Sequence, residues 1–344
     1  MTSASVSILI PAFNAERWIG AAIDSAVHQT WPSKEIIIVD DGSTDRTAAV
    51  AARFASEQVR VVSQKNAGAA SARNHAYSLS RGDYIQWLDA DDLLAPDKIA
   101  AQMRVVNAGL SPRTLLSGAF SEFIHRPAKA TSRETELWKD LSPTEWVLAK
   151  FERNLYMSNA TWLVSRDLAE TAGPWDTRLA LDDDGEYFCR VVLASDGVRF
   201  VPDAHVYYRR ANSGSLSYVG PAAAKLDSQF ESLAAQIRSL RAAEESERVR
   251  RACVKFLQTW AIYFYPERMD LFREVQQLAS ALGGEVQVPR LTWKYTWLEK
   301  LFGWPVAKRT QMYYNQLKWS VIRSYDKALF ELERRNPIEA QRLR

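Results

Sequence analysis

The segment Tyr84–Leu94 reads YIQWLDADDLL, and its apolar run leads directly into three aspartates within four positions. Asp89, Asp91 and Asp92 repel one another, and a carboxylate is costly to bury without a partner. Two interpretations are open at this point. Either the acids lie in a solvated turn that caps the next helix, or a positively charged ligand binds among them.

Short apolar runs alternate with helical patterns from the N-terminus to this segment. The first predicted strand ends at Pro11, because proline interrupts a central strand. The predicted strands are SVSILIP, EIIIVDDGS, VRVVSQ and DYIQWL. The predicted helices are Glu16–Val27, about Arg46 to Ser56, and AGAASARNHAYSLS. Strict alternation of strand and helix implies right-handed crossovers and a mostly parallel sheet flanked by helices, which is the α/β class.

Polar residues fall at the ends of all these strands. Asn14 follows the first strand, Asp40 and Asp41 the second, Asn66 the third, and Asp89–Asp92 the fourth. Ligands of open parallel sheets bind beyond the carboxyl ends of the strands, so these side chains are expected on one rim. An Asp-x-Asp pair there is suited to Mg²⁺ together with the oxygens of a substrate phosphate.

The pattern becomes looser from Thr114 to about Asn212 and then changes to long helices. The predicted strands of this part are TLLSGAFSEF, NATWLVS and RFVPDAHVYYR, and the predicted helices are Pro143–Glu152 and Gly185–Ala194. From about Pro221 the sequence is helical with few β-branched runs. We therefore place a domain boundary between Ser217 and Ala224.

The composition excludes several classes. The chain has 344 residues and a net charge of +3, which is too small to indicate a nucleic-acid partner. Cys189 and Cys253 form neither a disulfide framework nor a metal-spaced pair, which is typical of a reducing cytosol. The N-terminus MTSASVSILIPAF has no basic region, and no run of about 18 apolar residues occurs, so we expect no signal peptide and no transmembrane helix. The predicted location is cytoplasmic.

The stretch VSILIPAFNAERWIGAAIDSAVHQTWPSKEIIIVDDGSTDRT resembles the opening of the GT-A glycosyltransferases of family 2. The resemblance continues through NAGAASARNHAYSLSRGDYIQWLDADD and extends more thinly to about Ser217. It implies a Rossmann-like GT-A domain at 1–220, with a nucleotide-sugar half at about 1–112 and an acceptor half at about 113–220. The region 221–344 is then a C-terminal helical extension.

The resemblance also implies the roles of individual residues. The donor nucleotide and diphosphate are expected at Pro11, Ala12, Asn14, Glu16, Asp41, Asn66, Arg73 and Asp89. Asp41 would accept a hydrogen bond from the base, such as the N3–H of uracil. A Mn²⁺ or Mg²⁺ ion is expected at Asp91, with Asp92 as the alternative ligand and Asn212 where many relatives carry a histidine. Two purely structural roles stay open: Asp41 closes a turn, or Arg73 pairs with an acid on the rim.

A second acidic group lies in LALDDDGEYFCRVVL. Acids at a helix N-terminus are favoured by the helix dipole, which is one sufficient explanation. By resemblance to the family's ED-x-(D/E) segment, Asp184 is the catalytic base, with Glu186 and Asp183 as alternates. Trp175 precedes this segment and either stacks on an acceptor sugar or packs in the core.

The C-terminal stretch LTWKYTWLEKLFGWPVAKRTQMYYNQLKWSVIRSY mixes Trp and Tyr with Lys and Arg, and Glu299 is its only acid. This composition suits the interface of a membrane with anionic lipids. The alternative is a helical cap whose aromatic residues pack against the domain. The membrane interpretation would place the protein peripherally on the inner face of the membrane.

The predicted function is an inverting, metal-dependent glycosyltransferase. It would move a sugar from a nucleotide diphosphate sugar, by resemblance a UDP-sugar, to a hydroxyl of a glycan or lipid-linked acceptor in surface polysaccharide biosynthesis. A glycosidase also uses two carboxylates but needs neither metal nor nucleotide. A dehydrogenase would need a GxGxxG after the first strand, which is missing. The alternative from another class is a degenerate GT-A module that only binds a sugar nucleotide or glycan as a scaffold.

Overall fold

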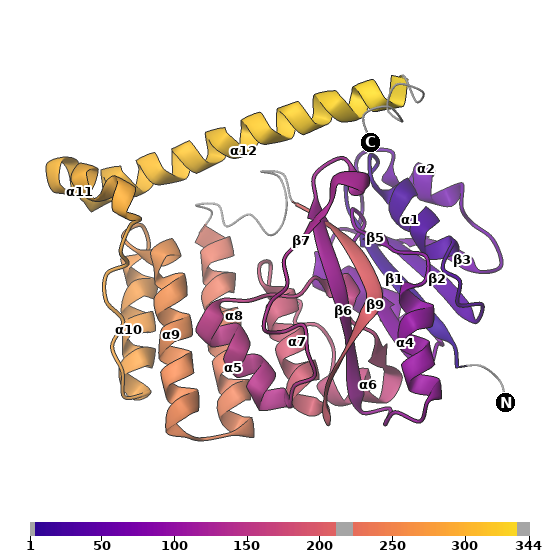
Figure 1. Ribbon diagram of the computed structural model, residues 1–344, viewed down its shortest axis with the longest axis horizontal. Coiled ribbons are helices and arrows are strands. Elements are labelled where there is room, and N and C mark those ends of the chain that lie inside the picture. The colour runs from indigo at the N-terminus through magenta and orange to yellow at the C-terminus, as the bar shows by residue number, and fades with distance from the viewer. Residues whose placement is uncertain (1–3, 211–222, 336–344) are drawn as a thin grey trace.

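The first sheet is built from four parallel strands, as the alternating pattern predicts. The computed structural model describes residues 4–210 and 223–335 (Figure 1). The strand order is β3-β2-β1-β4-β8, with only β8 antiparallel to its neighbour. The bounds are β1 Val6–Ala12, β2 Lys34–Asp40, β3 Val59–Ser63, β4 Tyr84–Trp87 and β8 Val164–Ser165. The α/β class is confirmed.

The central strand β1 continues one residue past the predicted end. Pro11 lies within β1 and pairs with Val39 of β2. The other neighbour, β4, pairs only as far as Leu9, so no partner on that side needs an N–H from residue 11. Proline is therefore tolerated here because the ladder is one-sided at this position.

Helices cover the first sheet. The predicted start of the first helix at Glu16 is wrong by three residues: α1 begins at Ile19, because Ala15 to Trp18 form a turn in which the Ala15 carbonyl accepts from the Trp18 and Ile19 amides, at 2.8 and 2.9 Å. The bounds are α1 Ile19–Val27, α2 Thr47–Ala52, α3 Ala69–Leu79 and α4 Lys98–Asn107. The buried face of α1 consists of Ile19, Ala22, Ile23 and Ala26.

A second sheet of four strands stands beside the first, in the order β5-β9-β6-β7. Its centre is the parallel pair of β6 and β9, and β6 has the predicted bounds. The predicted strand NATWLVS is mostly wrong, because the chain turns through the 3-10 helix η2 and only its last two residues form β8. The bounds are β5 Leu93–Leu94, β6 Thr114–Phe123, β7 Thr131–Ser132, β9 Gly197–Arg209, η1 Pro127–Lys129 and η2 Asn159–Thr161.

The helices that follow residue 222 share the core of the sheets. One continuous cluster of buried residues includes Ile8 and Trp87 of the first sheet as well as Leu233 of α8 and Phe256 of α9. The bounds are α5 Pro143–Arg153, α6 Arg166–Ala172, α7 Asp183–Ala194, α8 Ala223–Ala243, α9 Glu247–Phe264 and α10 Met269–Ala281. The predicted boundary at 220 lies outside the described residues, so the domain division stays a prediction.

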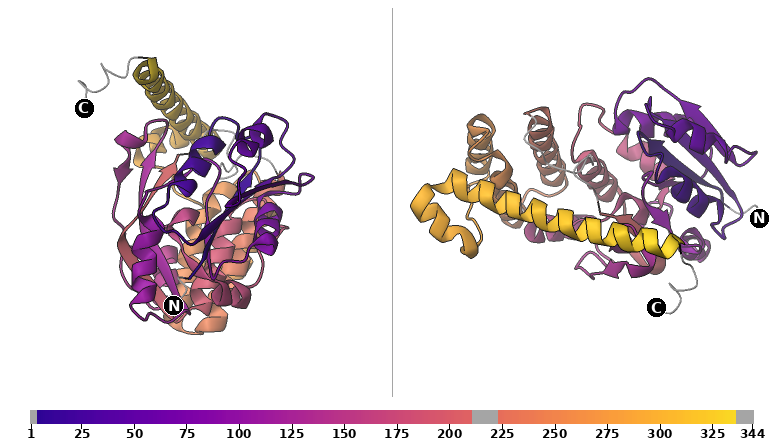
Figure 2. Two further views of the ribbon diagram at one scale, coloured as in Figure 1. Left: turned by 90° about the vertical axis from the view of Figure 1, so that its right-hand side faces the viewer. Right: turned by 90° about the horizontal axis from the view of Figure 1, so that it is seen from above.

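The C-terminal arm, residues 293–335, comprises the 3-10 helix η3 Trp293–Tyr295, α11 Thr296–Phe302 and α12 Trp304–Arg335. Helix α12 has 32 residues, which corresponds to about 48 Å of length. It lies across the molecule from α10 toward the two sheets, as Figures 1 and 2 show from three directions. Within the described residues, no helix combines the length and apolarity that a membrane span requires.

Gly118 is required where β6 and β9 shift register. A Cβ at this position would collide with the carbonyl oxygen of Ala204, and backbone cannot move aside cheaply. We expect Gly118→Ala to lower the free energy of unfolding by about 2–3 kcal/mol. Gly20→Ala in α1 is the control: its Cβ would lie 3.5 Å from Val50, so the change should be neutral or stabilise by up to about 1 kcal/mol. Denaturant titration of both variants measures the difference, and equal stabilities would contradict the prediction.

Candidate active site

The loops after β1 and β2 are held together by the side chain of Asn14. Its backbone has φ 47°, in the left-handed region, and its Oδ1 accepts from the Thr44 amide at 2.8 Å while its own amide donates to Ser43 Oγ at 2.9 Å. Glu16 accepts from the Arg46 amide at 3.0 Å and from Arg46 Nε at 3.2 Å. Both residues therefore lie on the expected rim and shape it.

Asp41 organises the loop after β3. Its Oδ1 accepts from Gln64 Nε2 at 2.7 Å and from the Ala67 amide at 2.9 Å, and its Oδ2 accepts from the Gly68 amide at 2.9 Å. Asn66 donates to the Asp41 carbonyl at 3.0 Å. A carboxylate oxygen has two acceptor sites, so Oδ2 can still accept one further hydrogen bond. Pro11 and Ala12 are buried beside this loop and can form only the floor of a pocket.

Arg73 joins two acidic segments that are far apart in the sequence. Its guanidinium donates to Asp89 at 2.9 Å and to Asp183 at 2.6 Å, and the side chain is 7% exposed. Asn159 donates to the other oxygen of Asp89 at 3.1 Å. Burial alone would lower the pKa of Arg73, but the charges of Asp183 and Asp89 raise it above its usual value. The interpretation of Arg73 as the partner of an acid on the rim is confirmed, and it has two such partners.

A second buried arginine, Arg209 at the end of β9, anchors the loop of Asp91 and Asp92. Its amide donates to Asp92 Oδ1 at 2.7 Å, and its Nε donates to the Asp91 carbonyl at 2.9 Å. The guanidinium carbon lies 3.9 Å from the Trp18 ring centroid and 4.3 Å from that of Phe123. Arg209 is therefore a buried cation rather than a solvated one.

The two candidate metal ligands differ in how their carboxylates are used. Asp92 is buried, and its second oxygen accepts from Ser158 Oγ at 3.3 Å, so each of its oxygens accepts one hydrogen bond. Asp91 receives no hydrogen bond from another side chain within residues 4–210 and 223–335. Of the two carboxylates, that of Asp91 is therefore the one with fewer partners in the described parts of the chain. Asn212, the third predicted ligand, lies outside the described residues.

Negative charge exceeds positive charge at this rim. Burial and the charge of Asp89 raise the pKa of Asp91 to about 6, despite the nearby Arg209. Burial and the neighbouring aspartates raise the pKa of Asp92 well above its usual value. Burial likewise raises the pKa of Asp183 to about 6, although Arg73 opposes the shift. Burial is thus the main reason that these carboxyl groups hold their protons more tightly, and the neighbouring carboxylates add to the effect.

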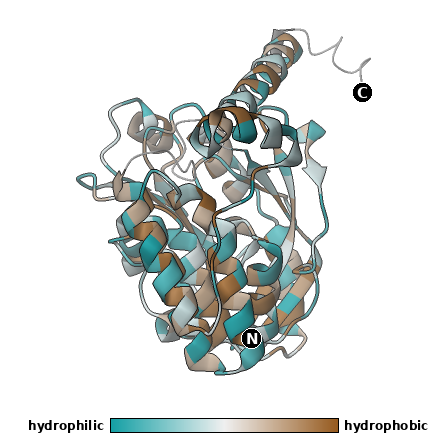
Figure 3. Cartoon of the chain, turned by 90° about the vertical axis from the view of Figure 1, so that its left-hand side faces the viewer, coloured by the Kyte–Doolittle hydropathy of each residue, from teal (hydrophilic) through white to brown (hydrophobic). Residues whose placement is uncertain are grey.

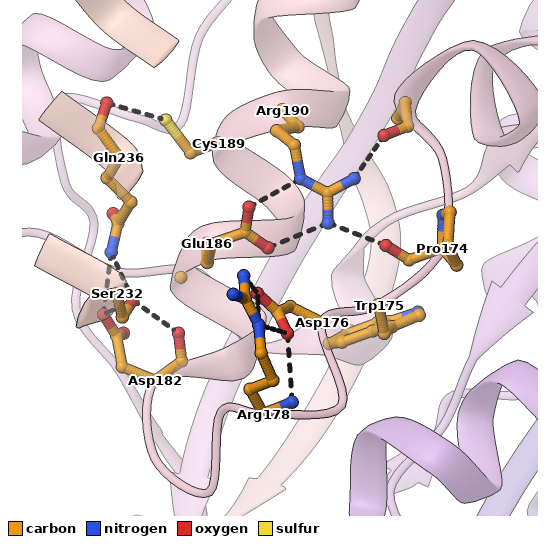
Figure 4. A network of polar contacts seen from close by, with 12 residues as sticks. Pro174, Trp175, Asp176, Arg178, Asp182, Glu186, Cys189, Arg190, Ser232 and Gln236 are labelled. Atoms are coloured by element: carbon orange, nitrogen blue, oxygen red, sulfur yellow. Dashed lines mark hydrogen bonds and ion pairs between the residues drawn. The ribbon is translucent and has the colours of Figure 1, made fainter. Parts of the chain in front are cut away.

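The segment before α7 is held by polar residues of α8 (Figure 4). Asp182 has φ 56°, and its Oδ2 accepts from Ser232 Oγ and Gln236 Nε2, both at 2.7 Å, and from Gln229 Nε2 at 3.3 Å. A glycine is required at position 185, because any Cβ there would collide with the Asp182 carboxylate. The C-terminal helices thus position the predicted base segment, which we did not anticipate. The spacing of Ser228, Ser232 and Gln236 on one face of α8 is the signal in the sequence.

Of the three predicted base candidates, Asp184 is the least engaged. Asp183 is paired with Arg73. Both oxygens of Glu186 accept from Arg190, at 2.6 and 2.8 Å, and Arg190 also donates to the Pro174 carbonyl at 2.9 Å (Figure 4). Asp184 accepts only from the adjacent Gly185 amide, at 2.9 Å, among the residues that the structure describes. The charge of Glu186 is therefore matched by Arg190.

Trp175 is a core residue, which is the second of its two interpretations. It is 2% exposed and stacks on Tyr187 with ring centroids 4.0 Å apart. It also contacts the guanidinium of Arg73, whose carbon lies 4.4 Å from the ring centroid. Trp175 therefore supports the site through Arg73 and has no face available for an acceptor sugar.

The donor set suits a hard divalent cation bound together with a phosphate. No group of three or more His, Cys, Asp or Glu side chains is arranged to hold a metal by itself in the described parts of the chain. Mg²⁺ and Mn²⁺ need only one or two carboxylates when substrate oxygens and water complete the shell. The partly exposed carboxylate of Asp91, amid unbalanced negative charge, fits that requirement.

The fold is similar to that of two proteins that have been solved with nucleotide sugars. The TarS fragment 1–349 from S. aureus, solved in complex with UDP-GlcNAc, superposes with a TM-score of 0.66 at 16% identity, over 81% of each chain. The mannosyltransferase PcManGT from Pyrobaculum calidifontis, solved with GDP-Man and Mn²⁺, gives a TM-score of 0.50 at 17% identity over 82% of this chain and 87% of that one. At these identities the likeness shows the fold.

Residues 7–111 match the family model of glycosyl transferase family 2. The chain is 46% identical over 96 residues to chondroitin synthase from Escherichia coli, covering 27% of this chain and 14% of that protein. It is 39% identical over 102 residues to a glycosyltransferase from Rickettsia typhi, covering 30% of this chain and 32% of that one. The chain thus spans at most about a third of the length of these relatives. The predicted family is confirmed.

Asp182 makes stability depend on pH in a defined direction. Burial raises the pKa of its carboxyl to about 6, above an unfolded value of about 3.9. Between these values the folded chain takes up a proton that the unfolded chain does not, so wild-type stability falls as the pH rises through that window. The Asp182→Asn side chain cannot take up this proton, so its stability does not change with pH for this reason. Its amide oxygen can still accept hydrogen bonds from Ser232, Gln229 and Gln236.

We expect the free energy of unfolding of Asp182→Asn, relative to wild type, to increase by about 2 kcal/mol between about pH 4.5 and 7.5. Thermal or urea unfolding across that range measures it. Glu57→Gln, at an exposed acid, is the control for the loss of one charge. A relative stability of Asp182→Asn that is independent of pH would contradict the assignment.

Proposed function

We propose that this protein transfers a sugar from a nucleotide diphosphate sugar to an acceptor hydroxyl, with inversion and with a divalent metal. One observation carries the proposal: on the rim of a family 2 domain, the acidic loop after β4 and the acidic segment before α7 meet at Arg73. These acids outnumber the two buried arginines, which leaves a place for a cation. A metal bound to a diphosphate supplies that charge.

The donor would bind across the ends of β1 to β4. The base would lie over Pro11 and Ala12 against Asp41, whose Oδ2 retains an acceptor site. Asn14, Glu16 and Asn66 would form the surrounding loops, and Asp89 would be held toward the ribose by Arg73 and Asn159. Asp91 would hold Mn²⁺ or Mg²⁺, which supplies charge stabilisation of the departing diphosphate. The TarS complex with UDP-GlcNAc supports a UDP-sugar, and PcManGT supports the metal.

Asp184 would act as the base. Its carboxylate takes the proton of the acceptor hydroxyl as the hydroxyl oxygen attacks the anomeric carbon. The new bond forms on the face opposite the departing nucleoside diphosphate, so the anomeric configuration inverts. Asp183 and Glu186 would serve as positioning residues, because Arg73 and Arg190 occupy them. The fixed backbone of Asp182 on α8 sets the direction of Asp184.

The acceptor would be a glycan or a lipid-linked sugar used in surface polysaccharide biosynthesis. The similarity to chondroitin synthase, a relative whose name indicates a polysaccharide product, supports this proposal. Synthesis from nucleotide sugars would place the protein in the cytoplasm, with a lipid-linked acceptor requiring contact with the inner face of the membrane. The competing hypothesis is a degenerate module that binds the donor without transfer.

Asp184→Asn tests the base. We expect its rate of nucleotide release with acceptor to fall by about 10³-fold, whereas affinity for UDP with Mn²⁺ should stay within about twofold, since Asp184 is not placed as a metal ligand. Asp183→Asn serves for comparison. It should affect stability and donor affinity, because it leaves Arg73 without one of its buried partners. Equal transfer rates in Asp184→Asn and wild type would exclude Asp184 as the base.

Asp91→Asn tests the metal. Calorimetry with UDP, GDP and dTDP, each with and without Mn²⁺, should show a metal-dependent affinity for one nucleotide that falls at least about tenfold in this variant. Asp24→Asn, an exposed acid on α1, is the matched control. Nucleotide binding without any transfer under all donors and acceptors tried would favour the scaffold hypothesis.

A further inference from the structure

Exposed apolar side chains are concentrated on the C-terminal arm. Twelve of the seventeen large apolar residues exposed in the described part of the chain belong to it. These twelve residues are Trp293, Trp297, Leu301, Phe302, Val306, Met312, Tyr313, Tyr314, Leu317, Val321, Tyr325 and Leu332. Among them, Trp293 is 78% exposed, Trp297 57% and Leu317 55%. An apolar surface of this extent is a site of interaction.

Except for Met312, the exposed apolar residues on α12 form a stripe opposite its docked face. Val306, Tyr313, Leu317 and Val321 are separated by seven, four and four positions, which places them on one side of the helix. Trp319 lies two positions after Leu317 and so points about 200° away from it. Trp319 faces the protein, where its ring covers the guanidinium of Arg210 at 4.4 Å. The stripe therefore faces outward along α12, on which apolar positions recur in Figure 3.

The docked face is held at both ends of α12, so the stripe is presented on a fixed helix. Near the start of α12, Lys308 is buried and donates to the Tyr265 carbonyl and to Glu267, both at 2.6 Å. Near its end, Asp326 accepts from Arg126 Nε at 2.7 Å and from the His125 amide at 2.8 Å. The arm is consequently part of the folded protein, and its outward face is what remains to be covered.

The charge of the arm indicates what covers it. Across the arm there are nine basic residues and four acids, and two of these acids, Asp326 and Glu333, pair with Arg126. Five of the basic residues whose side chains the structure describes are exposed, namely Lys294, Lys300, Arg309, Lys318 and Lys327. Long basic side chains beside an apolar stripe can extend toward anionic headgroups while their stems remain on apolar surface. Trp and Tyr are the side chains that favour the boundary between headgroups and acyl chains.

A second copy of the arm fits this surface less well. A helical pair needs apolar residues at two positions of every heptad. Ser320, Ser324 and Lys327 fall on or beside the stripe and interrupt that repeat. Two arms would also bring their exposed basic residues together. A planar anionic surface tolerates the interruptions and matches the charge.

We propose that the outward face of α11 and α12 binds the surface of a membrane that contains anionic lipids, with the arm lying in the interface. The position of the arm gives this contact a consequence. His125 and Arg126 follow β6, and Arg210 follows β9, whose last residue Arg209 holds the loop of Asp91 and Asp92. The arm thus docks on the rim that carries the candidate active site. Membrane contact would keep that rim close to lipid headgroups.

Vesicle flotation of the full chain, without donor or acceptor, tests this proposal independently of sugar transfer. We expect the wild type to float with vesicles containing phosphatidylglycerol, and to bind at least about tenfold less to phosphatidylcholine alone. Leu317→Glu/Val321→Glu should reduce partition into anionic vesicles at least about tenfold, since it places two charges in the stripe. Trp297→Ala/Phe302→Ala should reduce it by a smaller factor without adding charge.

The matched control is Gln277→Glu/Ser280→Glu, which adds the same charge on exposed positions of α10 and should bind vesicles like the wild type. Circular dichroism and thermal unfolding should be unchanged in all variants because the substituted side chains are exposed. Light scattering coupled to gel filtration gives the mass of each variant. The proposal is overturned if the wild type does not bind anionic vesicles, or if the stripe variant binds like the control. A wild-type dimer that the stripe variant converts to monomer, without vesicle binding, would assign the surface to a second copy.

Discussion

The guanidinium of Arg73 is the point at which the candidate site is assembled. It lies on α3, it pairs with Asp89 after β4 and with Asp183 before α7, and it is covered by the ring of Trp175. The two carboxylates come from halves of the chain separated by about a hundred residues, and one buried cation neutralises part of both. Removing one partner of such a buried ion pair typically lowers the free energy of unfolding by about 3–5 kcal/mol. The geometry between donor loop and base segment therefore depends on this side chain.

The imbalance of charge follows from that arrangement. Arg73 and Arg209 are buried among Asp89, Asp91, Asp92, Asp183 and Asp184, and burial, with a smaller contribution from neighbouring carboxylates, raises the pKa values of Asp91, Asp92 and Asp183. The aspartates differ in the groups that they contact. Asp92 attaches its loop to β9, Asp89 and Asp183 hold Arg73, and this leaves Asp91 and Asp184 with carboxylates that can act on a ligand. Chemically identical aspartates thus differ in their availability to a ligand because their neighbours in the folded chain differ.

The helices that follow the sheets contribute to the site as well as to the core. Helix α8 contacts the Asp182 carboxylate through Ser232 and Gln236, and α12 contacts the loop after β6 through Asp326. The helical region therefore cannot be regarded as a simple appendage. Helix α8 supports the base segment, and α12 presents an apolar face flanked by basic residues. The proposed site would thus lie close to a membrane surface, where a lipid-linked acceptor would be found.

The sequence by itself determined the alternation of strands and helices, the rim on which Asn14, Asp41, Asn66 and Asp89 gather, and the family of residues 7–111. These follow from local periodicity and from the order of strand ends, both of which are readable along the chain. Only the tertiary structure showed which partners Asp91, Asp92, Asp183, Asp184 and Glu186 have within the protein. It also decided that Trp175 is a core residue and that Arg209 is a buried one. The reason is physical: whether a carboxylate is free, paired or saturated depends on partners such as Arg73, Arg190 and Ser232, which lie many residues away and approach it only in the folded chain.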